Sequence, residues 1–120
     1  MRYLILINQN PHAFDGMTEE QLRAFGRGHR ELREALLESG ELVAGEGLAN
    51  ASLAHTVAVR DGRTVVSDGP FAEIKEHLAG FYLIEVSSFE RAVEIGTRVP
   101  DAELAEVELR PVLDLRAMDL

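Results

Sequence analysis

Two periods of apolar residues run along this chain, and they separate its strands from its helices. Residues 3–7 and 81–86 are nearly continuous apolar runs, which predict strands that are apolar on both faces. Other stretches alternate apolar and polar residues, as half-buried strands do. The strands expected from these patterns are residues 3–7, 42–48, 53–60, 63–67, 81–86 and 106–110.

A helix is expected between the first two strands. Thr18 and Gln21 have the spacing of a capping box at its start, and Gly40 is typical of its end. Apolar residues then recur with helical spacing and form one stripe: Leu22, Phe25, His29, Leu32 and Leu36. Because His29 belongs to this stripe, we expect its ring to point toward the sheet.

Two glycines interrupt that helix. Gly26 and Gly28 each cost about 1 kcal/mol relative to alanine inside a helix, so they need a reason. Close packing of the helix on a neighbouring element is one reason, and room for a ligand beside His29 is the other. A second helix is expected to begin at a capping box of Ser87 and Glu90 and to end before Pro100.

The dipeptide Asp61-Gly62 is the strongest hairpin signal in the sequence. A two-residue turn at this point fixes the register of the flanking strands, so that Arg60 faces Arg63. Counting outward along both strands, His55 faces Asp68.

The order of elements predicts an α+β fold. Without the hairpin, two strand–helix–strand units remain, which is the plan of a ferredoxin-like protomer. Two helices cover only one face of such a sheet, yet residues 3–7 and 81–86 are apolar on both faces. A large exposed apolar patch is rare on a monomer, so we expect a homodimer in which a second copy covers the open face.

Composition excludes several classes of protein. The 120 residues carry 12 basic and 21 acidic side chains, a net charge of −9, and no cysteine. Disulfide scaffolds, thiol nucleophiles and thiolate metal sites are therefore ruled out. The negative charge argues against nucleic-acid binding. No run approaches a membrane span and the N-terminal apolar run is too short for a signal peptide, so we expect a cytoplasmic protein.

His29 and Asp68 are the candidate catalytic residues. Asp68 ends a hairpin strand before a Gly-Pro turn, and a carboxylate that orients an imidazole makes a general acid or base. The alternatives are a core histidine and an aspartate that only makes a turn, and His55 competes for the same carboxylate. No cofactor is expected. Glu73 and His77 would share a helix face, but two ligands do not make a metal site.

One segment resembles a known family. Residues 68–73, Asp-Gly-Pro-Phe-Ala-Glu, followed by Lys75-Glu76 and then Gly-Phe-Tyr at 80–82, resemble the signature of the DGPF branch of the YCII-related family. Residues 45–48 and 108–112 are similar to that family's segment before the hairpin and to its closing strand. The resemblance implies a domain over residues 1–113 and a separate C-terminal tail over 114–120.

The resemblance also carries expectations about architecture and site. It implies a dimeric α+β barrel of ferredoxin-like protomers and an active-site His–Asp pair at His29 and Asp68. From the residues themselves, Glu73, Lys75 and Glu76 form either a polar rim of the cleft, with Lys75 attracting an anionic group, or only a solvated loop face. Phe71, Glu73 and Lys75 are the candidate substrate-binding residues.

Three hypotheses about function remain open. One is a small enzyme that uses the pair for acid–base chemistry on a small organic substrate. The second is a non-catalytic protein that binds a small ligand or, as the resemblance implies, acts as a regulatory accessory of an extracytoplasmic-function sigma factor. The third is a plain dimeric scaffold with a filled interior.

Overall fold

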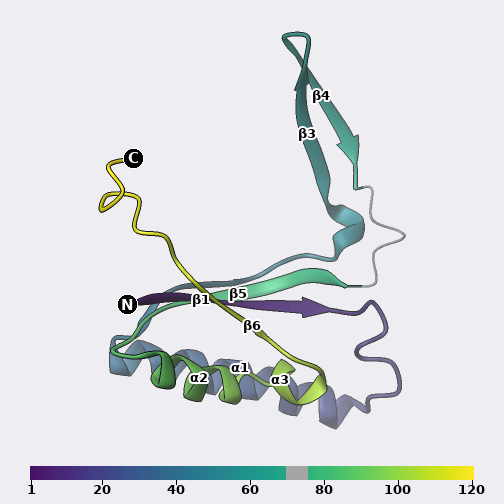
Figure 1. Ribbon diagram of the computed structural model, residues 1–120. Coiled ribbons are helices and arrows are strands. Elements are labelled where there is room, and N and C mark those ends of the chain that lie inside the picture. The colour runs from purple at the N-terminus through teal and green to yellow at the C-terminus, as the bar shows by residue number, and fades with distance from the viewer. Residues whose placement is uncertain (70–75) are drawn as a thin grey trace.

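A four-stranded antiparallel sheet with helices on one face forms the body of the protein (Figure 1). The computed structural model describes residues 1–69 and 76–120. The strands found there are β1 (Arg2–Gln9), β2 (Leu42–Gly47), β3 (His55–Arg60), β4 (Arg63–Asp68), β5 (His77–Glu85) and β6 (Glu108–Pro111). The helices are α1 (Glu19–Ser39), α2 (Phe89–Arg98), α3 (Asp101–Leu104) and the 3-10 turn η1 (Ala51–Leu53).

The strand order is consistent with the ferredoxin-like fold expected from the sequence. The sheet runs β2-β5-β1-β6, and each neighbouring pair is antiparallel. β1 and β2, joined by α1, are therefore parallel strands separated by β5, and β5 and β6, joined by α2, are separated by β1. The sheet stays open between its edge strands β2 and β6 in the described part of the chain, so this chain does not form a closed barrel.

The core lies between the sheet and the two long helices. Alternate residues of β1 and β5 point into it, and α1 and α2 close it from the other side. Fully buried side chains form its centre: Ile5, Leu32, Leu36, Ile84, Ile95 and Val99.

Outside the core, Arg91 of α2 binds Glu41 next to β2, with its Nη2 2.8 Å from Oε1. The hydrogen bonds from Arg91 lower the pKa of Glu41 to about 2.

The helix boundaries confirm one predicted cap and correct another. Thr18 caps α1 in a full capping box with Gln21, and Gly40 ends the helix with a φ of 78°. At α2, however, Ser88 is the cap and its hydroxyl accepts from the Arg91 amide, so the expected box of Ser87 and Glu90 is wrong by one residue. The chain also makes the short helix α3 directly after Pro100, which the sequence analysis did not predict.

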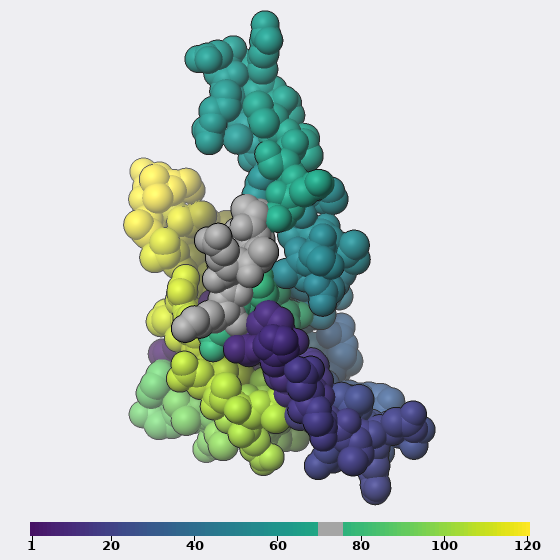
Figure 2. Space-filling view, turned by 90° about the vertical axis from the view of Figure 1, so that its right-hand side faces the viewer, coloured from purple at the N-terminus to yellow at the C-terminus, as the bar shows by residue number. Residues whose placement is uncertain are grey.

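The hairpin of β3 and β4 has the predicted register. Arg60 faces Arg63 and His55 faces Asp68, while Asp61 and Gly62 both adopt the positive φ of a type I′ turn. The hairpin projects well beyond the sheet in Figures 1 and 2, and every β4 residue is exposed. Among the described residues, the hairpin therefore has no core of its own.

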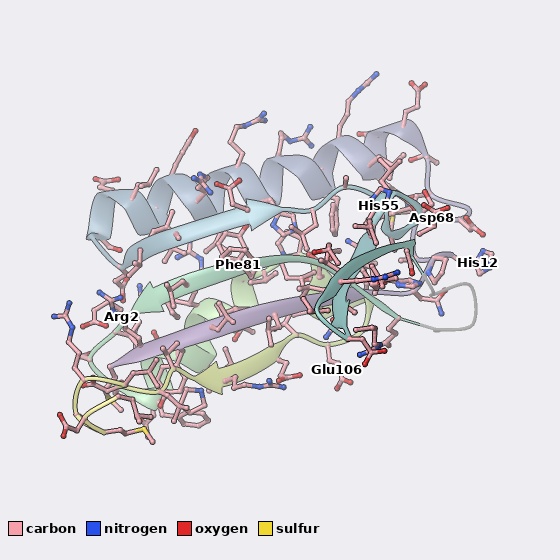
Figure 3. The ribbon with its side chains drawn as sticks, turned by 90° about the horizontal axis from the view of Figure 1, so that it is seen from above. Arg2, His12, His55, Asp68, Phe81 and Glu106 are labelled. Atoms are coloured by element: carbon pink, nitrogen blue, oxygen red, sulfur yellow. The ribbon has the colours of Figure 1, made fainter. Side chains whose placement is uncertain are left out.

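The face of the sheet away from the helices is apolar at its centre. Strand alternation places Leu4 and Leu6 of β1 on this face, and β5 places Leu83 and Phe81 opposite them. Figure 3 looks onto this face, with Phe81 labelled on it. All of these side chains are only half-buried. We call this set of four residues the open face.

Candidate functional site

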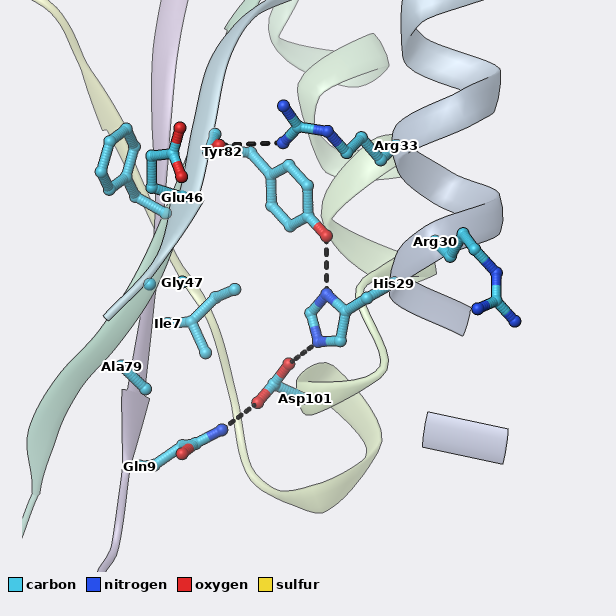
Figure 4. A pocket seen from close by; sticks show the side chains of 13 residues that line it. Ile7, Gln9, His29, Arg30, Arg33, Glu46, Gly47, Ala79, Tyr82 and Asp101 are labelled. Atoms are coloured by element: carbon cyan, nitrogen blue, oxygen red, sulfur yellow. Dashed lines mark hydrogen bonds and ion pairs between the residues drawn. The ribbon is translucent and has the colours of Figure 1, made fainter. Parts of the chain in front are cut away.

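His29 lies where α1 passes over β5, and both of its ring nitrogens are engaged (Figure 4). Nδ1 is 2.6 Å from the Tyr82 hydroxyl and Nε2 is 2.6 Å from Asp101 Oδ1. The ring also contacts two aromatic rings, stacked on Tyr82 and edge-on to Phe25. The helical stripe seen in the sequence therefore does point this imidazole toward the sheet, as predicted.

Asp101 is the one charged side chain that is buried among the described residues, with 3% of its surface exposed. It is the first residue of α3, and its two oxygens have separate partners. Oδ1 meets His29, and Oδ2 accepts from Gln9 Nε2 at 3.0 Å. A buried carboxylate is tolerable only when it is hydrogen-bonded in this way. Gln9, at the end of β1, thus holds the carboxylate toward the imidazole.

The chemistry of these partners fixes the direction of the hydrogen bonds. A carboxylate only accepts hydrogen bonds, so His29 Nε2 carries a hydrogen atom and donates a hydrogen bond to Asp101. In neutral His29 the Nδ1 lone pair then accepts from the Tyr82 hydroxyl. In protonated His29, Nδ1 donates to the Tyr82 oxygen instead. Burial, with the Asp101 charge adding to it and Arg33 opposing it, raises the pKa of Tyr82 to about 12, so Tyr82 stays a phenol.

These groups form one wall of a cleft of about 370 Å³. The cleft lies between α1 and the strands β1, β2 and β5, and its size is at the lower end for small-molecule sites. Its apolar wall includes Ile7 and Ala79, and its α1 side includes Arg30 and Arg33. Figure 4 shows the Arg30 side chain pointing away from the strands, so a small organic molecule would meet the hydrogen-bonded groups, an apolar surface and the Arg33 guanidinium in one space.

Arg33 is held across the edge of the sheet. Its Nη1 donates to the Gly45 carbonyl of β2 at 2.8 Å. A Cβ at Gly45 would lie 3.3 Å from this nitrogen and 3.2 Å from the Tyr82 ring, so the glycine leaves room for both side chains. Arg33 is exposed as a residue, but this bond holds its guanidinium beside the cleft.

Comparison with known proteins bears on this fold and site together. The family model described as "YCII-related domain" matches residues 1–116. The chain belongs to the YCII-related domain family. It is also 30% identical over 114 residues to an uncharacterized protein, R00369, of Rhizobium meliloti (strain 1021), a match that covers 93% of this chain and 92% of that protein.

The expected pairing of His29 with Asp68 does not form in this YCII-related chain. Asp68 lies on the hairpin beside His55, 3.6 Å from its Nε2, and its side chain is fully exposed (Figure 3). The predicted register of the hairpin explains this position, because it sets Asp68 directly opposite His55. Asp101 takes the place next to His29 that the sequence analysis gave to Asp68.

The other predicted site residues cannot be compared with the structure. Phe71, Glu73 and Lys75 lie outside the described residues. Within residues 1–69 and 76–120, no group of three or more His, Cys, Asp or Glu side chains is arranged to hold a metal ion. No helix in those ranges has the length and apolar character needed to cross a membrane.

Sequence reasoning missed four residues of the site. Tyr82 lies inside an apolar strand, where an aromatic side chain is expected to belong to the core. Gln9 and Arg33 lie among polar residues that give no sign of a site. Asp101 left a usable signal, because proline followed by an acidic residue is typical of a helix start. The sequence pattern marks Pro100 as the end of the second helix, so it does not by itself predict the short helix that presents Asp101.

Proposed function

We propose that this YCII-related protein is a small enzyme whose His29 site moves a proton to or from a small organic molecule in the cleft. The observation that supports the proposal most directly is the continuous hydrogen-bonded chain from Asp101 through His29 to Tyr82, which lines that cleft. Oriented imidazoles of this kind are the commonest general acids and bases at neutral pH.

Tyr82 is the group that would meet the substrate. In the basic direction, its oxygen takes a proton from the substrate while its own proton passes to His29 Nδ1. In the acidic direction, His29 returns a proton to the oxygen and the hydroxyl proton goes to the substrate. Tyr82 begins and ends as a phenol in either direction, which agrees with its pKa of about 12. Asp101 stabilises the imidazolium that forms.

An isotope-exchange assay tests this role directly. The protein is incubated in D₂O with a panel of small ketones and keto acids, and loss of their acidic C–H signals is followed by proton NMR. We expect the native protein to accelerate exchange in members of the panel, and His29→Gln to lower that rate by at least ~100-fold. Arg27→Gln, a substitution on the exposed side of α1, is the control and should exchange at the native rate. Equal rates for the native protein and His29→Gln across the panel would rule out proton transfer.

A non-catalytic ligand-binding protein is the second candidate. One observation favours it: both nitrogens of His29 already have protein partners, so neither is free to touch a ligand. In that case the chain of hydrogen bonds would serve to position Tyr82 for binding. An accessory role beside a sigma factor, membership of the DGPF branch and a cytoplasmic location remain predictions from the sequence.

A homodimer is part of the same proposal. The open face is half-buried and apolar, and the hairpin carries exposed valines, among them Val57 and Val66 at 69% and 61% exposure. The radius of gyration is 16.9 Å, whereas a compact chain of this length has a value of about 14 Å. A second copy packed sheet against sheet would cover the open face and form the expected dimeric barrel.

A further inference from the structure

We propose that the ligand of the His29 cleft is a small carboxylic acid whose carboxylate binds to the Arg33 guanidinium. The inference names the ligand class for the site proposed above, and so rests on that proposal for the reaction. The assignment of Arg33 as the carboxylate-binding group does not depend on that reaction and rests on the structure.

Arg33 has N–H donors beyond the one that binds Gly45. A guanidinium carries five N–H donors in a planar fork that matches a carboxylate, and the Gly45 carbonyl uses one of them. In the described part of the chain, Arg33 forms no ion pair with any carboxylate. The bond to Gly45 fixes where the remaining donors lie, at the end of the cleft beyond the Tyr82 ring (Figure 4).

Of the described residues, two acidic ones line the cleft, and neither neutralises Arg33. The Asp101 carboxylate is buried and already bonded to His29 and Gln9. Glu46 follows Gly45 on β2, so strand alternation sends its side chain to the opposite face of the sheet, as Figure 4 shows. A locally cationic end of a cleft is unusual in a protein with a net charge of −9, and it would attract an anion.

The spacing of the polar groups limits the size of the ligand. His29 and Arg33 are four residues apart on one face of α1, a rise of about 6 Å along the helix. A molecule of a few carbon atoms spans that distance, with its carboxylate at Arg33 and its reacting group near Tyr82. The walls of Ile7 and Ala79 suit the short apolar part between them.

The test compares an anionic probe with its neutral isostere. Butyrate and butyramide are titrated separately, up to about 100 mM, into ¹⁵N-labelled protein, and amide and arginine side-chain shifts are followed by NMR. We expect butyrate to shift the Gly45 amide and the Arg33 Nε–H in a saturable manner. Butyramide should bind at least roughly tenfold more weakly, since it lacks the charge-assisted bond.

Two variants separate the possible outcomes. Arg33→Gln should weaken butyrate binding by at least roughly tenfold, whereas Arg27→Gln, with the same change of charge on the same helix, should bind as the native protein does. Both titrations measure binding and not proton exchange, so a failure of the proposed proton transfer does not affect this test. Equal binding of butyrate and butyramide, equal effects of Arg33→Gln and Arg27→Gln, or saturable shifts from inorganic phosphate and none from butyrate would each overturn the carboxylate assignment.

Discussion

At the scale of single residues, Gly28 sets the distance between α1 and Asp101. A Cβ at this position would lie 2.7 Å from Cγ of Pro100, the residue before Asp101, which is closer than real side chains approach. Gly26, two residues earlier, has open space around it. Of the two explanations that the sequence left open for these glycines, close packing therefore applies to Gly28, and it serves the site because it brings Asp101 to His29.

The two glycines give a matched pair of substitutions. Gly28→Ala should destabilise the protein, because the proline ring cannot yield without moving α3, and it should weaken the contact of His29 with Asp101. Gly26→Ala should stabilise it by about 1 kcal/mol, the usual gain from alanine in an open helix position. Urea denaturation measures both. A Gly28→Ala variant as stable as Gly26→Ala would contradict the packing role of Gly28.

At the scale of elements, sequence signals predicted those features that depend on interactions between residues close together in the chain. The register of β3 and β4 followed from Asp61-Gly62 because a two-residue turn leaves one pairing. The turn could not predict where Asp68 lies relative to α1, because the hairpin and that helix are far apart in the sequence. The cap of α2 shows a similar limit: two adjacent serines offer two possible starts, and the helix uses Ser88.

That choice of cap can be measured. Ser88→Ala removes the hydroxyl that accepts from the Arg91 amide and should lower the free energy of unfolding by about 1 kcal/mol. Ser87→Ala changes an exposed residue outside the helix and should alter stability by less than about 0.5 kcal/mol. Thermal unfolding followed by circular dichroism distinguishes them. If the larger loss belonged to Ser87→Ala, the predicted capping box would be right and the observed cap wrong.

At the scale of the whole molecule, the candidate site depends on parts that are distant in sequence. Gln9, His29, Tyr82 and Asp101 come from β1, α1, β5 and α3, and only the fold brings them together. The stripe on α1 was enough to predict that His29 faces the sheet. Its partner could not be predicted, because that required knowing how closely α1 approaches Pro100, and this approach depends on Gly28.

The proposed dimer is a property at the same scale, and one charge can test it. Leu83→Lys places an ammonium group in the centre of the open face, where burial against a second copy would be costly. Leu37→Lys makes the same change on α1 at a residue that is 58% exposed, and serves as the control. By multi-angle light scattering, we expect the native protein and Leu37→Lys at twice the chain mass of 13.3 kDa, and Leu83→Lys shifted toward that single mass. A native protein of 13.3 kDa at micromolar concentration would mean that the open face stays uncovered, and the dimer would have to be abandoned.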